Sequence, residues 1–298
     1  MTVQQCKYVL GIAETGSFNE AAKRLFVAQS SLSLSIKSLE DELGIKIFDR
    51  TDGGVCLTED GTEFVQYARR MTEQHNFIIE RFTRNDGGDH LYVSTQHYDF
   101  VADIFAKMMN ETASDSFHLA LREMKTYDIL KETETAFCDI GIIAIKRADA
   151  AIMKRYLGKH GLEFTMIREA KPHIFIKKDH PLAGNEKVSA EMLKDLPYVS
   201  FEQGKHNISF FSEEIFAPGG SKQVEISDRA SLLNILLATD SYTVGTGIMP
   251  SLLNGGRIIS IPFESNGSYL IGFIMRKDRN PSPLTKRFIE IMKEELED

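Results

Sequence analysis

The stretch from residue 17 to residue 44, SFNEAAKRLFVAQSSLSLSIKSLEDELG, most constrains the fold, because it predicts two short helices joined by a tight bend. Ser17 and Glu20 have the spacing of a capping box, in which side chains satisfy free backbone N–H groups at a helix start. In the second helix, one apolar stripe at helical spacing contains Leu32, Ile36, Leu39 and Leu43. The stripe would fix this helix against its neighbour and leave the opposite side exposed.

That opposite side offers hydroxyls, an amide and a single cation. Such groups contact base edges and phosphates when a helix enters the major groove of DNA. The candidate DNA-binding residues on this helix are Gln29, Ser30, Ser31, Ser33, Leu34 and Lys37. Periodicity alone favours an ordinary helical hairpin with a solvated face, so the residue identities have to decide between the two interpretations.

The identities favour DNA binding. Residues 16–50, followed by LTEDG, closely resemble the winged helix-turn-helix of LysR-type transcriptional regulators. The coinciding positions include Ser17, Phe18, Ala21, Ala22, Leu25, Gln29, Leu32, Ser33, Ile36, Leu39, Glu40, Leu43, Gly44, Phe48, Arg50, Leu57, Thr58 and Gly61. The resemblance implies an N-terminal, all-α winged helix-turn-helix, a long linker helix, and an α/β effector domain with two lobes like a type 2 periplasmic binding protein.

The sequence departs from the family at three positions of this motif. Ala28 replaces a frequent serine cap, and Ser30 replaces a frequent proline. Leu34 replaces a frequent arginine, whose pairing with guanine is worth about 1–3 kcal/mol of discrimination. Leu34 could instead contact a thymine methyl group, which predicts an AT-rich operator. Gln29 is then the main candidate for reading a base, with adenine as its natural partner.

The residues after this motif predict a wing. A short strand near 45–48, a turn at 52–54 and a second strand at 55–57 form a hairpin. Arg50 at its edge is expected to contact a phosphate, as are the serines and Lys37 of the preceding helix. An ion pair between Arg50 and a neighbouring acid such as Asp49 is the alternative.

A long helix is predicted from Thr58, its N-cap, to about Phe82. Its apolar positions alternate four and three apart, which is typical of a coiled-coil seam. The seam contains Phe64, Ala68, Met71, His75, Ile78 and Phe82. It predicts a homodimer, and the resemblance implies both this dimer and further pairing into a homotetramer. His75 is interpreted as a packing residue.

Residues 85–89 are turn formers and predict a hinge, after which strands and helices alternate. The predicted domains are a DNA-binding domain at 1–57, a linker helix at 58–84 and an effector-binding domain at 89–298. Within the last, we expect lobe I at about 89–162 and 268–298, and lobe II at about 163–267.

Ligands of open α/β sheets bind at the carboxyl ends of strands, and the resemblance places the effector cleft at these same junctions. The predicted effector-binding residues are Ser94, Thr95, Gln96, Thr126, Ser200, Phe201, Arg229 and Thr246. Helix capping is an equally good explanation for any one of the hydroxyls. If His97 and Arg229 face the cleft, the effector is expected to be an anion such as a small carboxylate.

Composition sets further bounds. The formal net charge of −8 predicts weak nonspecific DNA binding. The three cysteines have no metal-ligand spacing, and no catalytic or cofactor motif is present, so we expect no metal site, no cofactor and no enzyme activity. No leader or membrane-spanning stretch is apparent, which predicts a cytoplasmic protein without a membrane partner.

These observations predict a regulator that binds double-stranded DNA and responds to a small-molecule effector between two lobes. Effector binding would change the spacing or angle of the DNA-reading heads. The alternative is a constitutive DNA binder of the same fold, with an empty cleft.

Overall fold

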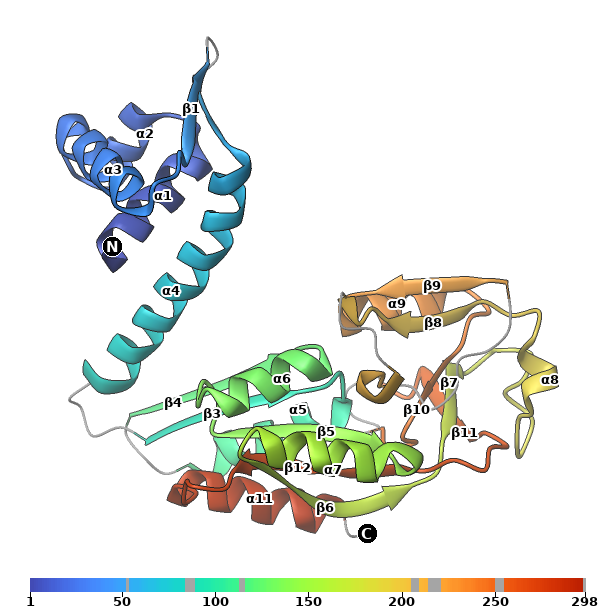
Figure 1. Cartoon of the computed structure of the whole chain (residues 1–298). Helices are drawn as coiled ribbons and strands as arrows, with labels where there is room; N and C mark the ends of the chain where they lie inside the picture. Colours follow the sequence, from blue (N-terminus) through green and yellow to red (C-terminus); the bar gives the residue numbers. More distant parts are fainter. Residues whose placement is uncertain are drawn as a thin grey trace. The chain divides into compact units, whose positions relative to one another are not determined.

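The computed structural model describes residues 1–51, 54–83, 89–112, 116–204, 209–213, 221–249 and 255–296. The chain forms two compact units, Met1–Gly87 and Gly88–Asp298 (Figure 1). Among the described residues, no helix has both the length and the apolar character that crossing a membrane requires.

The first unit is a winged helix-turn-helix followed by a long helix. Its elements are α1 (Val3–Thr15), α2 (Phe18–Arg24), α3 (Gln29–Leu43), β1 (Phe48–Thr51), β2 (Gly54–Leu57) and α4 (Glu59–Thr83). Leu32, Ile36 and Leu39 of the predicted stripe are buried with residues of α1 and α2, whereas Leu43 at the helix end is exposed. The antiparallel pairing of β1 with β2 forms the wing.

Side-chain caps fix where these helices begin. Thr2 and Gln5 form a complete capping box at α1. At α2 only half of the predicted box forms, because Ser17 accepts from the Glu20 backbone N–H while the Glu20 carboxylate pairs with Lys23. Thr58 caps α4 by accepting from the Gly61 N–H.

The structure corrects part of the predicted seam on α4. Phe64 packs against the core of the winged helix-turn-helix, and Ala68 is buried within the single chain. The sulfur of Met71 lies 3.5 Å from that of Cys6 on α1. Phe64 and Ala68 therefore already have partners in their own chain and need no second copy, whereas Met71 contacts α1 on one side only. Met71 and Ile78 remain 38% and 46% exposed. His75 is half-buried, and the side chain of Phe82 lies outside the described residues.

The second unit contains a five-stranded sheet in the order β4-β3-β5-β12-β6. Its strands are β3 (Asp89–Thr95), β4 (Phe117–Glu123), β5 (Ile140–Lys146), β6 (Leu162–Ala170) and β12 (Tyr269–Arg276). β3 runs parallel to β4 and β5, and β12 runs antiparallel to β5 and β6. Residues 140–145 of β5 are buried and form a continuous apolar run, as expected for a strand covered on both faces.

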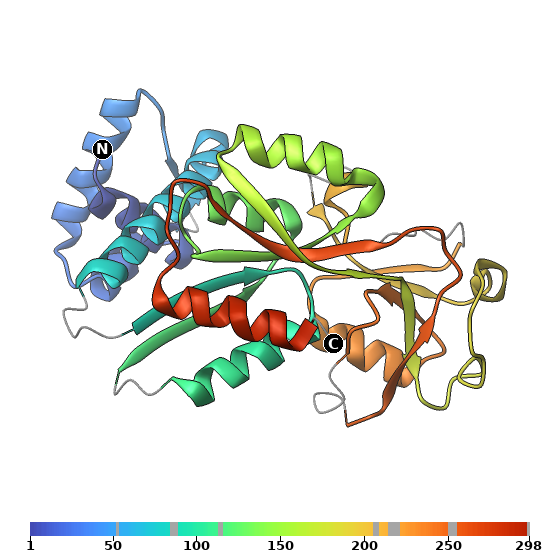
Figure 2. The same ribbon diagram turned by 90° about the horizontal axis from the view of Figure 1, so that it is seen from below.

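Helices cover both faces of this sheet. α5 (Asp99–Glu111) and α11 (Pro283–Leu296) share one apolar core, and they lie side by side in Figure 2. α6 (Thr126–Glu134) and α7 (Ala150–Lys159) share another core on the opposite face. A 3-10 turn at Arg147–Asp149 precedes α7.

The remaining strands form two smaller sheets. β10 (Thr243–Gly245), β7 (His173–Lys177) and β11 (Ile258–Pro262) are antiparallel, and β8 (Tyr198–Phe201) pairs in parallel with β9 (Gln223–Ile226). α8 (Ala190–Leu193) and α9 (Arg229–Ala238) complete this second lobe. A 3-10 turn at Ser209–Phe211 lies between β8 and β9 in the sequence, but its two phenylalanines pack against the α6 and α7 core of lobe I. The predicted fold class, a winged helix-turn-helix followed by a two-lobed α/β domain, is confirmed.

The predicted lobe boundary at residue 163 is wrong. β6 pairs with β12 from Leu162 to Ala170, so this segment belongs to lobe I and the chain enters lobe II only before β7. The chain returns to lobe I between the end of β11 at Pro262 and the start of β12 at Tyr269.

Candidate functional site

The exposed side of α3 is the first candidate site. Gln29, Ser30, Ser31, Leu34 and Lys37 are exposed, and Ser33 is half-exposed. The Gln29 side-chain amide donates to the Ser33 hydroxyl over 2.9 Å, which orients the amide along the helix. A shallow groove beside α3 is lined by Ser30, Ser33, Leu34 and Lys37, together with Phe18, Lys46, Phe48 and Asp49 near the wing. The Arg50 side chain lies outside the described residues.

Two large apolar side chains are exposed beside these polar groups. Leu34 is 70% exposed, and Phe26, in the bend between α2 and α3, is 95% exposed. Phe26 also adopts a left-handed backbone conformation with φ of 55°, which is uncommon for a residue other than glycine. Phe26 was not among the predicted DNA-binding residues, although an aromatic residue in a tight bend beside α3 stands out in the sequence.

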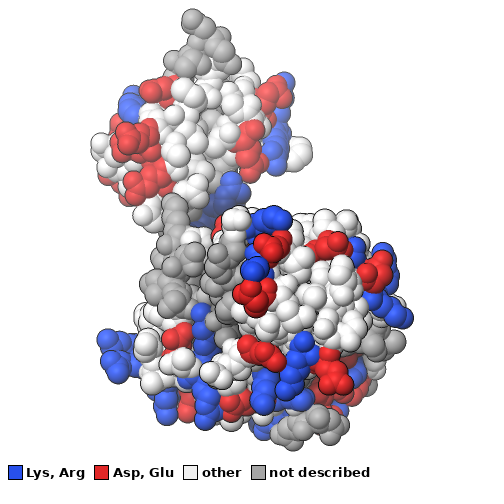
Figure 3. All heavy atoms as spheres, turned by 90° about the vertical axis from the view of Figure 1, so that its right-hand side faces the viewer, with Lys and Arg blue, Asp and Glu red and all other residues white. Residues whose placement is uncertain are grey.

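A buried carboxylate supports the base of the wing. Glu40 accepts from the backbone N–H groups of Ile47 and Phe48 and pairs with Lys46 at 2.9 Å. Burial raises the pKa of Glu40, but the Lys46 contact and the two N–H donors outweigh it, so its pKa is lowered. Acidic and basic side chains are interspersed on the face seen in Figure 3, in keeping with the net charge of −8.

The second candidate site is a cavity of about 50 Å³ between the lobes of the second unit. Three of the predicted effector-binding residues line it: Phe201, Arg229 and Thr246. The rest of its wall comes mainly from the start of α5, from α9 and from the segment after β10.

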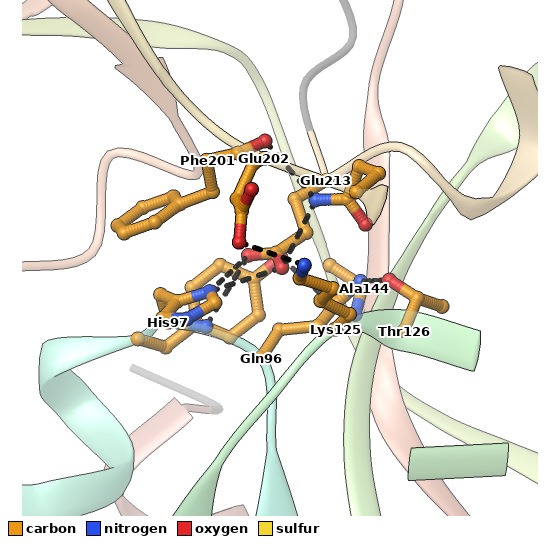
Figure 4. Close-up of polar contacts among 10 residues, drawn as sticks. Gln96, His97, Lys125, Thr126, Ala144, Phe201, Glu202 and Glu213 are labelled. Atoms are coloured by element: carbon orange, nitrogen blue, oxygen red, sulfur yellow. Dashed lines mark hydrogen bonds and ion pairs between the residues drawn. The ribbon is translucent and has the colours of Figure 1, made fainter. Parts of the chain in front are cut away.

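The structure places Ser94, Thr95, Gln96, Thr126 and Ser200 away from the cavity wall. Gln96 is fully buried, and its amide is used inside lobe I (Figure 4). Its nitrogen donates to the Thr126 hydroxyl over 2.6 Å, and its oxygen accepts from the Ala144 N–H over 2.6 Å. The Ser94 hydroxyl donates to Glu132 on α6. These side chains connect β3 to its neighbours instead of facing a ligand.

His97, just after β3, makes the most buried ionic contact of the cleft. Its Nδ1 lies 3.0 Å from Oε1 of Glu213, just after the 3-10 turn, and its backbone N–H donates to Oε2 of the same carboxylate (Figure 4). Its ring stacks on Phe201 with the centroids 4.0 Å apart. Burial lowers the pKa of His97, but the hydrogen bond and charge of Glu213 and the charge of Glu123 outweigh it, so the pKa is raised.

Arg229 and Lys125 each form ion pairs that join the lobes. Arg229 at the start of α9 lies 2.5 Å from both Asp99 and Glu123 of lobe I. Lys125 of lobe I pairs with Glu202 of lobe II at 2.8 Å. Both cationic groups that favoured an anionic effector, His97 and Arg229, do line the cavity, but each is already paired with a carboxylate. The basis for predicting an anion is therefore removed.

Metal binding and thiol chemistry have little support among the residues that the structure describes. No cluster of three or more His, Cys, Asp or Glu side chains there could hold a metal ion. Cys6, Cys56 and Cys138 are free thiols. Burial raises the pKa of Cys138 to about 11, which keeps that thiol protonated and unreactive at neutral pH.

Comparisons with known proteins match both units. Residues 3–62 match the family model described as bacterial regulatory helix-turn-helix protein, lysR family. Residues 140–297 match the model of the LysR substrate binding domain. The HTH-type transcriptional regulator AlsR of Bacillus subtilis (strain 168) is 24% identical over 302 residues, covering 98% of this chain and 95% of AlsR. ClcR of Pseudomonas putida is 24% identical over 307 residues and 98% of both chains.

Solved structures agree on the fold. The crystal structure of CbnR, a LysR family transcriptional regulator, has a TM-score of 0.66 at 17% identity and covers all of both chains. Full-length CbnR complexed with its target DNA has a TM-score of 0.65 at 18% identity, over 99% of this chain and 100% of CbnR.

Proposed function

The chain belongs to the LysR family of bacterial regulatory helix-turn-helix proteins, and from this premise we propose how it works as a transcriptional regulator. In this proposal α3 reads double-stranded DNA, and a small-molecule effector in the cleft between the lobes modulates DNA binding or promoter activation. The relatives are named transcriptional regulators, and we propose no catalytic activity.

The DNA-binding proposal rests on the exposed polar side of α3. The opposite, apolar side of this helix is buried and fixes its position. Gln29 would read adenine, and Leu34 would contact a thymine methyl group. Ser30, Ser31, Ser33, Lys37 and Arg50 would contact the backbone and set the register of the helix on the duplex. One structural neighbour, CbnR, is described in complex with its target DNA, which supports this mode of use.

The ionic contacts across the cleft support the proposal of effector control. Arg229 of lobe II pairs with Asp99 and Glu123 of lobe I, and His97 of lobe I stacks on Phe201 of lobe II, all at the cavity. A ligand that changes these contacts stabilises one arrangement of the lobes over another. By linkage, the same ligand then changes the affinity for DNA.

We further propose a homodimer that forms through α4, with pairs of dimers forming a tetramer. The proposed seam consists of Met71, His75 and Ile78, because Phe64 and Ala68 pack within their own chain. We also propose that the regulator acts in the cytoplasm, where it would meet its DNA partner.

A second candidate, a constitutive DNA binder, is favoured by the small size of the cavity. The deciding experiment is a DNA footprint on the gene's own upstream region, repeated with a wide panel of metabolites. A footprint that shifts or changes in affinity with one metabolite supports the effector-controlled regulator. A stable footprint that no metabolite alters supports the constitutive binder.

A further inference from the structure

The wall of the interlobe cavity is mainly apolar. α9 contributes Leu232, Leu233 and Leu236, and the segment after β10 contributes Ile248 and Met249. These side chains belong to lobe II or to the segment following it, and they face His97 and Tyr98 at the edge of lobe I. Such a wall gains free energy from contact with hydrocarbon and offers a ligand few hydrogen-bonding groups.

The charged groups at the cavity form ion pairs with one another. The two guanidinium nitrogens of Arg229 each meet a different carboxylate, and Glu213 receives the ring and the backbone N–H of His97. Three carboxylates thus oppose two cationic groups. Even with His97 protonated, the cluster carries one net negative charge, so an added carboxylate would be repelled and would find no unpaired cation in it.

We propose, on the basis of the effector function above, that this cleft takes a compact, mainly apolar ligand without a negative charge. The cavity, of about 50 Å³, suits a compact ligand better than a large one. A branched, four-carbon skeleton that bears a hydroxyl or an amine matches both the leucine wall and the charge of the cluster.

The test compares three probes that share one hydrocarbon skeleton: isobutanol, isobutylammonium and isobutyrate. Binding of each to the full-length protein is measured by ligand-observed NMR at neutral pH and fixed ionic strength. We expect isobutanol and isobutylammonium to bind at least tenfold more tightly than isobutyrate. Isobutyrate binding as tightly as isobutanol, or no detectable binding of any probe at 10-millimolar order, would overturn the proposal.

Two pairs of variants locate the binding. Leu233→Trp should fill the cavity and abolish binding of isobutanol, whereas Ile152→Trp adds the same bulk at an exposed position on α7 and should have no effect. Unchanged isobutanol binding in Leu233→Trp would contradict the assigned site.

Glu123→Gln removes one carboxylate from the cluster and frees one guanidinium nitrogen of Arg229, and it should strengthen isobutyrate binding at least tenfold. Glu225→Gln, at an exposed position on β9, is the matched control and should leave all three affinities unchanged. No gain for isobutyrate in Glu123→Gln would overturn the electrostatic argument. Failure of this ligand proposal is distinguishable from failure of the proposed regulator function. The footprint measures sequence-specific DNA binding separately.

Discussion

His97 and Glu213, which lie 116 residues apart in the sequence, form a buried ionic contact at the cleft. Each side chain is only 5% exposed, and the ring of His97 stacks on Phe201 of β8 in lobe II. The protonation of this imidazole therefore affects a ring that contacts the other lobe.

Stability of the effector unit should therefore fall at high pH. The pKa of His97 is raised above its ordinary 6.5, with burial opposing the shift and Glu213 and Glu123 causing it. A raised folded-state pKa means that the stabilisation is fully present below pH 6.5 and is lost as the pH rises through the folded-state pKa. Melting temperatures from pH 6 to pH 9 should fall more for the wild type than for His97→Gln. Identical pH profiles of the two proteins would contradict this assignment.

Gln29→Ala should selectively weaken binding to the operator. Losing a bidentate contact with adenine costs about 1–3 kcal/mol, while nonspecific binding depends on phosphate contacts that remain. Affinities for operator and random DNA at one salt concentration measure the difference. Equal losses on both DNAs would remove Gln29 from base reading.

Aspartate at both Met71 and Ile78 should convert dimers into monomers, because like charges would face each other across the proposed seam. Sedimentation of the double variant measures the assembly. Gln66→Asp, at an exposed position of the same helix outside the seam, is the control and should remain dimeric. A dimer that survives the double substitution would exclude this seam.

Gln96→Ala should destabilise the effector unit by about 1–3 kcal/mol, since it leaves the buried Ala144 N–H without its acceptor. Urea unfolding measures the change in the free energy of unfolding. Asn234→Ala, at an exposed position on α9, should change that free energy by no more than about 0.5 kcal/mol. A similar small change in Gln96→Ala would mean that the buried amide is not structural.

Local patterns made much of the fold predictable. The bounds of β7 at His173–Lys177 and of β10 at Thr243–Gly245 follow from short runs between turn residues. α7 was not predicted, although its buried Met153 and Leu157 have helical spacing. β11 was not predicted either, because a run of five residues is too short to show a clear period. β6 was assigned to the wrong lobe, since strand pairing with a segment about a hundred residues later leaves no local trace.

Only some of the cleft residues could be predicted from the sequence. Phe201, Arg229 and Thr246 were found because they stand at the ends of strands or at a helix start. Glu213 was missed because nothing near it in the sequence marks it as the partner of His97. Gln96 was interpreted as a ligand contact from its place at a strand end, but a polar side chain there can equally bond to the backbone of the next strand.

A competition titration tests the central claim, that α3 of this chain reads DNA sequence, most directly. The full-length protein is titrated with a labelled fragment of its own promoter against unlabelled random fragments of equal length, at low ionic strength. We expect the protein to stay bound to the promoter fragment at a large excess of random DNA. Equal competition by random and promoter fragments would contradict it.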